Sequence, residues 1–318
     1  MISIRKILFP TDFLQCSEQA LRYALFLTKR YQSELHVVHI AVPPENNYEA
    51  ETSATWNSAV AEERLAERVQ AIADQLASKS EHPPIVKEHF VRGTSVAPSL
   101  LEYSAEQDFD LIVMGTHGRR GVGHLFLGSV AETMVRHSPC PVLTVREGKE
   151  PPREETPKRI LVPIDLSDHS VLALSYAKFL AADYGARLQV LHVVEESLHP
   201  SFYAMGRTPV TMMMADILLS AKAETERLIE GAPGPEIPAE TFVIQGHAPS
   251  DIVRLANEHG SDLIVIATHG LTGIEHFLLG SVTEKVVRTA SQPVFTVKSF
   301  GKRLLPGLPQ LSDPEEVR

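Results

Sequence analysis

Glycine and serine residues at fixed spacing carry the strongest chemical signal in the chain. Gly115 and Gly118 follow the apolar run 111–114, and nine residues separate Gly118 from Gly128-Ser129. Glycine leaves the backbone bare, so that a bulky ligand can approach it. Gly128-Ser129 precedes a helix-like stretch, whose first turn would offer unpaired N–H groups, the positive end of a helix dipole and a hydroxyl. This set of donors suits a phosphate.

The same arrangement occurs again in the second half of the chain. After the apolar run 263–267, Gly270 is followed by nine residues and then by Gly280-Ser281. Ala267 takes the place of the first glycine. A repeat of this length and order indicates two copies of one domain.

An acidic residue closes the first apolar strand of each copy. Asp12 ends the run 6–12, and Asp165 ends the run 159–165. If the first and fourth strands of a parallel sheet are neighbours, their carboxyl ends meet, and each Asp faces its glycine loop across one crevice. The sequence therefore predicts two acidic residues, each opposite a phosphate site.

Strands alternate with helices throughout both copies, which indicates a parallel α/β sheet in each. We expect a first domain over 1–146, a charged and proline-containing linker over 147–157, and a second domain over 158–298. The tail, 299–318, is rich in Pro, Gly and Leu, and we expect it to be loosely packed or disordered. The expected strands are 6–12, 34–42, 85–91, 111–114 and 141–145, then 159–165, 188–194, 241–244, 263–267 and 293–297.

Composition limits the class of protein. The 318 residues suffice for two domains, and 43% hydrophobic content without a long apolar run argues against a membrane protein. The net charge of −10 argues against a general nucleic-acid binder. The chain starts directly with strand-like sequence, without an apolar leader, so we expect a cytoplasmic protein. Two cysteines without a CxxC pattern predict neither a disulfide framework nor a zinc site.

The motif Gly115-x2-Gly118-x9-Gly128-Ser129, together with Pro10-Thr11-Asp12, resembles the ATP-binding branch of the universal stress protein family. The resemblance extends over both copies and thus over nearly all of the chain. It implies two Rossmann-like domains, each a five-stranded parallel sheet of order 3-2-1-4-5 with helices on both faces. It also implies binding of ATP, or of AMP or ADP, without strong turnover.

The resemblance assigns roles to particular residues. In the family, the Asp after the first strand approaches the adenine and ribose, and a residue near the end of the second strand packs against the adenine. The first glycine lies near the ribose, and the second glycine, the Gly-Ser pair and the next Val hold the phosphates. The implied contact residues are Pro10, Thr11, Asp12, Ile40, Met114, Gly115, Gly118, Gly128, Ser129 and Val130 in the first domain, and Pro163, Ile164, Asp165, Val193, Ala267, Gly270, Gly280, Ser281 and Val282 in the second.

Simpler structural roles exist for the same residues. Asp12, Asp165 and the two motif serines could be helix N-caps, and the glycines could form tight turns. Ala267 departs from the family pattern: its methyl group costs little if φ is negative, whereas a positive φ would force the loop to shift. We therefore expect the first domain to be the surer nucleotide site. The histidines of the glycine loops are read as loop residues, not as metal ligands.

Three functions remain open from the residues. The first is a nucleotide-binding protein of stress response or signalling, whose state follows ATP occupancy, with Mg²⁺ accompanying the phosphates. The second is a slow ATPase or nucleotidyl-transfer enzyme that uses the same pocket. The third is a structural pairing module without ligand. The sequence lacks GxxxxGK[ST] and a clear general base near a nucleophile, so we expect at most weak hydrolysis and assign no catalytic residue.

Assembly is expected to follow from the edge strands. The fifth strand of each copy, 142–145 and 294–297, is an apolar edge that invites pairing. We expect the two domains to pack as a pseudo-twofold pair through these strands, and the whole chain to form a further homodimer. A protein partner is expected, but the sequence does not identify it.

Overall fold

The structure is a computed structural model that describes residues 2–43, 58–78, 81–116, 127–147, 156–195, 207–269 and 279–305; the side chains of 207–213 are not described. The chain divides into two compact units. Domain 1 comprises residues 3–155 and 300–304, and domain 2 comprises residues 1–2, 156–299 and 305–318.

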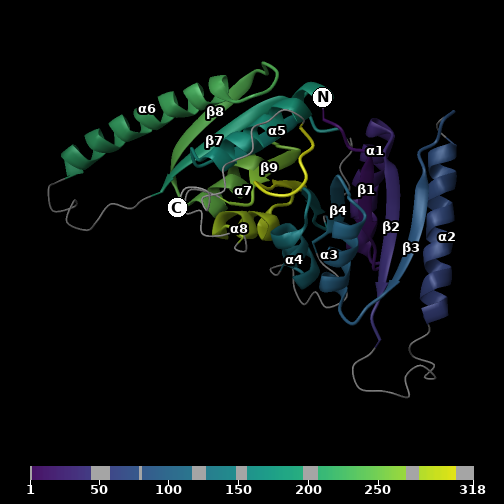
Figure 1. The fold of residues 1–318 in the computed structure, drawn as a ribbon. Helices are drawn as coiled ribbons and strands as arrows, with labels where there is room; N and C mark the ends of the chain where they lie inside the picture. Colours follow the sequence, from purple (N-terminus) through teal and green to yellow (C-terminus); the bar gives the residue numbers. More distant parts are fainter. Residues whose placement is uncertain are drawn as a thin grey trace, which may run out of the picture. The chain divides into compact units, whose positions relative to one another are not determined.

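Domain 1 is a parallel sheet whose strands follow the order β3-β2-β1-β4-β5, as predicted. The return from β3 to β4 reverses the direction of winding, so β1 and β4 become neighbours at the reversal point. The helix α2 runs alongside β3 at one edge of the domain (Figure 1). Its elements are β1 (Lys6–Pro10), α1 (Gln15–Tyr31), β2 (Glu34–Ala41), α2 (Ser58–Ala77), β3 (Val86–Arg92), α3 (Val96–Glu106), β4 (Leu111–Gly115), α4 (Ser129–His137) and β5 (Val142–Val145).

Domain 2 has the same topology, with the strand order β8-β7-β6-β9-β10. The third strand extends beyond the predicted 241–244 at both ends. The elements are β6 (Arg159–Ile164), α5 (Asp168–Tyr184), β7 (Arg187–Glu195), α6 (Arg207–Gly231), β8 (Ala239–Gly246), α7 (Ala248–Glu258), β9 (Leu263–Ala267), α8 (Ser281–Thr289) and β10 (Val294–Val297).

Continuous apolar runs form the central strands because helices cover both faces of each sheet. In domain 1 the side chains of Ile7 and Leu8 on β1 and of Leu111 and Ile112 on β4 are fully buried. Right-handed crossovers place α1 and α2 on one face of this sheet and α3 and α4 on the other, where α3 and α4 pack on each other. Among the helices that the structure describes, none combines the length and apolar character needed to cross a membrane.

A carboxylate holds the amino end of β1 to the chain before β4. The Asp110 Oδ2 atom accepts hydrogen bonds from the backbone N–H groups of Arg5 (2.6 Å) and Lys6 (2.8 Å). In domain 2 the Asp262 Oδ2 atom accepts from Lys158 and Arg159 in the same way, at 2.8 and 2.9 Å. The same two hydrogen bonds therefore occur in both domains. They show which residue of one copy corresponds to which residue of the other.

The first residues after domain 2 differ from the expectation of a loose tail. Residues 300–304 belong to domain 1, where the Lys302 ammonium lies 2.9 Å from Asp110 Oδ1 and 2.8 Å from Asp108 Oδ2. The Lys302 N–H donates to the Pro139 carbonyl oxygen at 2.6 Å, and the Leu304 side chain is buried. A cation beside two carboxylates and a buried leucine order this segment. Residues 306–318 lie outside the described residues.

A cluster of rings, which we call the ring cluster, fills the amino end of domain 1 between β2, β3 and α3. The rings of His36 and His89 stack in parallel, with centroids 4.8 Å apart, and Phe109 meets His36 edge-on at 4.8 Å. Tyr103 contacts both His89 and Phe109. His36 Nε2 lies 2.8 Å from the Glu34 carboxylate, but His36 Nδ1 and His89 Nε2 are buried without a partner. Burial lowers the pKa of both histidines, so the cluster favours neutral imidazoles.

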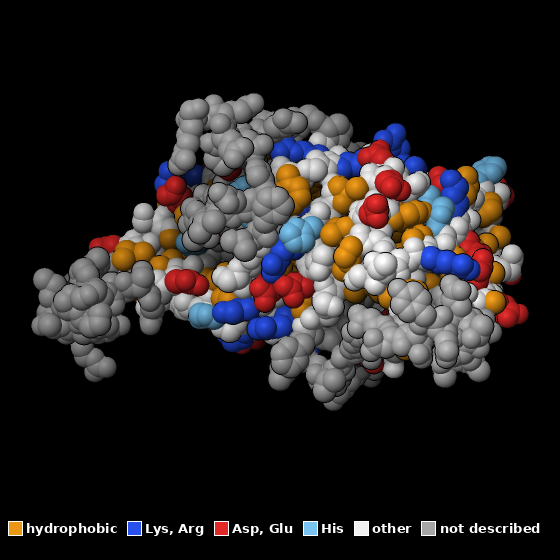
Figure 2. Space-filling model, turned by 60° about the horizontal axis from the view of Figure 1, so that its bottom comes forward, with side chains coloured by type: hydrophobic (Ala, Val, Ile, Leu, Met, Phe, Trp, Pro, Cys, Tyr) orange, Lys and Arg blue, Asp and Glu red, His pale blue; other side chains and the backbone are white. Residues whose placement is uncertain are grey.

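Charges of both signs mix on the surface that Figure 2 shows, where basic and acidic side chains are interspersed and the basic ones form no continuous patch. Ion pairs also form along single helices, as Arg254 of α7 does with Asp251 and Glu258 at 2.9 Å each. A nucleic-acid backbone is bound by clustered Lys and Arg, which this face does not present.

Lys302→Ala is expected to lower the free energy of unfolding by about 1–3 kcal/mol, because the buried Asp110 carboxylate loses its charged partner. Urea unfolding followed by circular dichroism measures the change. Lys222→Ala, at an exposed position of α6, is the matched control and should leave the midpoint unchanged. Equal midpoints for both variants would contradict the role given to Lys302.

The ring cluster predicts a loss of stability in acid. The pKa of His36 and His89 is lowered in the folded state, so the unfolded state binds protons first as the pH falls below about 6.5. Domain 2 carries Gln189 and Phe242 at the equivalent positions, and the double variant His36→Gln/His89→Phe copies them. Its free energy of unfolding should fall less between neutral pH and pH ~5 than that of the parent. If the free energy of unfolding fell equally with pH in the variant and in the parent, the role given to His36 and His89 would be refuted.

Candidate functional site

The carboxyl ends of the two central strands meet in each domain. In domain 1, Leu8 of β1 lies opposite Ile112 of β4, so Asp12 after β1 and Gly115 at the end of β4 lie at the same end of the sheet, where the sequence predicts a crevice. In domain 2, Leu161 of β6 pairs with Ile264 of β9. This is the reversal point at which open α/β sheets bind ligands, and the predicted aspartate follows one of the two strands that meet there.

Asp12 lies half-buried in the turn between β1 and α1. Its Oδ1 atom accepts a hydrogen bond from the Leu14 N–H at 3.1 Å, and the Thr11 hydroxyl accepts one from the Phe13 N–H at 3.1 Å. Phe13 has φ 63, a left-handed conformation, which turns the chain sharply after the aspartate. Oδ2 makes no bond within the described residues, so Asp12 stabilises the turn with one oxygen and keeps the other as an acceptor.

Asp165 is more fully engaged in domain 2. Its Oδ1 atom accepts from the Ser167 N–H at 3.1 Å and from the hydroxyls of Ser167 and Ser170 at 2.5 Å each. Ser167 is also the N-cap of α5, because its side chain accepts from the Ser170 N–H. Burial lowers the pKa of the neighbouring His169, although Asp165 and Asp168 act against the shift. The aspartate therefore accepts hydrogen bonds from two serine hydroxyls in domain 2, whereas in domain 1 it accepts one from a backbone N–H group.

Gly115 has a packing reason that the sequence did not reveal. A Cβ atom at this position would lie 2.8 Å from the Cys16 Sγ atom and 3.0 Å from the Cys16 carbonyl carbon, because α1 crosses close to the end of β4. Its φ is not among the positive values of the described residues, and neither is that of Ala267. The methyl group of Ala267 is therefore accommodated without backbone strain, and the departure from the family pattern does not distort this end of β9.

Gly128 and Gly280 begin the helices that follow the glycine loops. Both are N-cap residues with similar backbone angles, φ −63 and ψ 138 for Gly128 and φ −57 and ψ 133 for Gly280, and neither helix has a side-chain cap. Their own N–H groups donate to the carbonyl oxygens of Thr116 (2.8 Å) and Thr268 (2.9 Å). The side chains of Ser129 and Ser281 are exposed, in the first turn of each helix. Within the described residues, no side chain caps the first turns of α4 and α8, which begin beside the ends of β4 and β9, and uncapped N–H groups suit an anion.

Two histidines at the crevices were missed by the sequence reading. His39 Nδ1 lies 2.8 Å from the Thr11 carbonyl oxygen, and His192 Nδ1 lies 3.0 Å from that of Ile164. A carbonyl oxygen only accepts, so Nδ1 carries the proton in both rings. Each histidine fixes the residue just before an aspartate. The signal was available, because both histidines stand at the same distance after the aspartate in the two copies.

The other predicted contact residues lie around the same crevices. Ile40 is buried near the end of β2, and Val193 is half-buried near the end of β7. The Arg64 guanidinium lies over the Phe13 ring, 4.8 Å from its centroid, and brings a cation to the rim of the domain 1 crevice. Buried or half-buried positions in the described strand ends and helix starts are held by Pro10, Thr11, Met114, Val130, Pro163, Ile164 and Val282. Gly118 and Gly270 lie outside the described residues.

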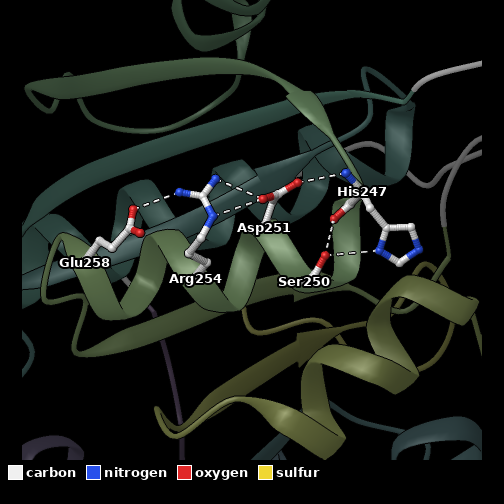
Figure 3. A network of polar contacts seen from close by, with 5 residues as sticks. All are labelled: His247, Ser250, Asp251, Arg254 and Glu258. Carbon is white, nitrogen blue, oxygen red and sulfur yellow. Dashed lines mark hydrogen bonds and ion pairs between the residues drawn. The ribbon is translucent and has the colours of Figure 1, made fainter.

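Ser250, His247 and Asp251 at the start of α7 have the residue types of a hydrolytic triad, but not its geometry. Asp251 Oδ2 accepts from the backbone N–H of His247 at 2.7 Å, and Oδ1 accepts from Arg254 at 2.9 Å (Figure 3). The imidazole points away from the carboxylate, and its Nδ1 atom lies 3.2 Å from the Ser250 hydroxyl. This network caps α7. Within the described residues, no group of three or more His, Cys, Asp or Glu side chains is placed to hold a metal ion.

Comparison with known proteins places this fold. The model of the universal stress protein family matches residues 3–146 and 156–298. The universal stress protein YxiE of Bacillus subtilis is 33% identical over 145 residues, which cover 44% of this chain and 98% of that protein. The universal stress protein Rv2005c of Mycobacterium tuberculosis is 26% identical over 270 residues, covering 83% of this chain and 86% of that protein.

A solved universal stress protein from Archaeoglobus fulgidus shares the fold, with a TM-score of 0.63 and 22% identity over 92% of this chain and 98% of the other. The two family matches coincide with the two sheets and their duplicated crevices. The chain therefore belongs to the universal stress protein family, with two copies of the family's domain in tandem.

Proposed function

We propose that each crevice binds an adenine nucleotide, ATP or its products ADP and AMP, and that the protein acts in stress response or signalling through nucleotide occupancy. The observation that carries this proposal is the pair of uncapped helix starts at Gly128 and Gly280, each beside the end of a central strand. Their first-turn N–H groups and dipoles favour a phosphate. The family membership supports the same use of the crevice.

The aspartates supply the complementary end of the proposed site. The Oδ2 atom of Asp12 has no partner within the described residues and can accept a hydrogen bond from a ribose hydroxyl or an adenine amine. Ile40 offers an apolar surface for the base. In domain 2 the Asp165 carboxylate already accepts from two serines, so we propose domain 1 as the tighter site.

Magnesium is proposed to arrive with the triphosphate. Mg²⁺ binds through phosphate oxygens and waters in many nucleotide sites, with few protein ligands. The described residues offer no preformed cluster of metal-ligating side chains, which fits binding through the nucleotide.

Binding, not turnover, is the proposed activity. Hydrolysis needs a base within reach of the attacking water. The Ser250 and His247 pair is engaged in capping α7, and the crevice groups described above hold the backbone in place. Pairing of the domains through 142–145 and 294–297, a homodimer of the whole chain and a protein partner that reads the occupancy stay predictions.

Ser129→Glu tests the phosphate end of the domain 1 site. A carboxylate in the first helical turn favours α4 but repels phosphate, so ATP affinity in domain 1 should fall at least about tenfold without loss of stability. Ser281→Glu should do the same in domain 2, and isothermal titration calorimetry of single and double variants separates the two sites. Ala66→Glu, exposed on α2, is the control of equal charge. Unchanged ATP binding in the double variant would refute the proposal.

A further inference from the structure

An open cavity lies at the amino ends of the domain 2 strands, on the opposite edge of the sheet from the nucleotide crevice. Its volume is about 660 Å³, within the usual range for small-molecule sites. The polar lining comes from Arg159 at the start of β6, Arg187 and Gln189 on β7, Glu240 on β8 and His259 after α7. Leu188, Pro238 and Ala239 supply the apolar part. We call this space the amino-end cavity.

Beside the amino-end cavity, domain 2 has no ring where domain 1 has Phe109. The equivalence of Asp110 and Asp262 places Ser261 where domain 1 has Phe109. In domain 1 the Phe109 ring packs against His36 and Tyr103 in the ring cluster. In domain 2 the Ser261 hydroxyl instead donates to Gln189 Oε1 at 2.7 Å, which leaves the Gln189 amide nitrogen as a donor at the cavity.

The charges at the cavity are also arranged differently from those of domain 1. Glu34 and Lys87 form an ion pair in domain 1, and Arg187 and Glu240 occupy the equivalent strand positions in domain 2. Within the described residues, no ion pair joins Arg187 to Glu240, and the Arg187 guanidinium has no hydrogen-bond partner. An arginine that has no partner at the wall of a cavity can donate hydrogen bonds to an anion that enters the cavity.

The second arginine is held in place. Arg159 Nη1 donates to the His259 carbonyl oxygen at 2.6 Å, which fixes the guanidinium and leaves its remaining nitrogens without partners in the described residues. The His259 ring rests against Phe242, with centroids 4.5 Å apart. The lining of the cavity thus holds two guanidinium groups, one imidazole and one amide nitrogen, but a single carboxylate, that of Glu240. Guanidinium groups bind carboxylate and phosphate with paired, charge-assisted hydrogen bonds.

We propose that the amino-end cavity binds a small organic anion. Its carboxylate or phosphate group accepts hydrogen bonds from Arg159 and Arg187, and its carbon skeleton lies on Pro238 and Ala239. Glu240 selects molecules that also carry a hydroxyl or amine donor. This site is separate from the proposed nucleotide site and does not depend on it.

Isothermal titration calorimetry of the full chain with glycerol phosphate and with malate tests the proposal, because each probe carries one of the two anionic groups together with a hydroxyl. We expect at least one probe to bind, and which one binds identifies the group. Arg187→Gln should weaken that binding by about tenfold, the usual loss for a charge-assisted hydrogen bond. Arg227→Gln, exposed on α6, is the matched control and should bind as the parent does.

A second variant distinguishes loss of the binding site from loss of the folded structure. Arg187→Glu/Glu240→Lys keeps the net charge and recreates the ion pair of domain 1, so it should abolish binding while circular dichroism stays native. Ser281→Glu, which alters the nucleotide crevice, should leave the binding of the probe unchanged. No binding of either probe, equal binding by Arg187→Gln, or loss of binding in Ser281→Glu would each overturn the proposal.

Discussion

The parallel pairing of the first strand with the fourth is the constraint on which the rest of each domain depends. Leu8 opposite Ile112, and Leu161 opposite Ile264, bring together segments that are about a hundred residues apart in the sequence. At the carboxyl ends this pairing sets an aspartate beside an open helix start. At the amino ends it is anchored by Asp110 and Asp262, each of which accepts two backbone N–H groups. The register between the first and fourth strands therefore determines which residues meet at the carboxyl ends and at the amino ends of the strands.

The two copies share this strand pairing but differ in the residues at both ends of their strands. At the carboxyl edge, Asp12 keeps a free oxygen, whereas Asp165 is held by Ser167 and Ser170. At the amino ends of the strands, domain 1 has a ring cluster and the paired Glu34, whereas domain 2 has Ser261 in place of Phe109 and a cavity. The proposals use this duplication, with two nucleotide sites of the same kind at the carboxyl ends and an anion site of a different kind at the amino ends of domain 2.

Much of the fold could be predicted from the sequence, because buried parallel strands are continuous apolar runs and both copies repeat them. The strand order came from the family resemblance, and the structure agrees with it. Contacts between distant segments could not be predicted in the same way. The need for glycine at position 115 depends on how closely α1 passes, through Cys16, and the order of Lys302 depends on two carboxylates nearly two hundred residues earlier. The amino-end cavity is lined by residues of three strands and of the turn after α7, which no local sequence pattern brings together.

The central claim is that the open N–H groups at the starts of α4 and α8 receive the phosphates of an adenine nucleotide. Amide chemical shifts of the deuterated chain, followed during a titration with Mg²⁺ and ATP, test it most directly. The account predicts the largest downfield shifts at Ser129 and Val130, with Ser281 and Val282 responding at higher ATP concentration. Shifts confined to other parts of the chain, or none at millimolar ATP, would contradict it.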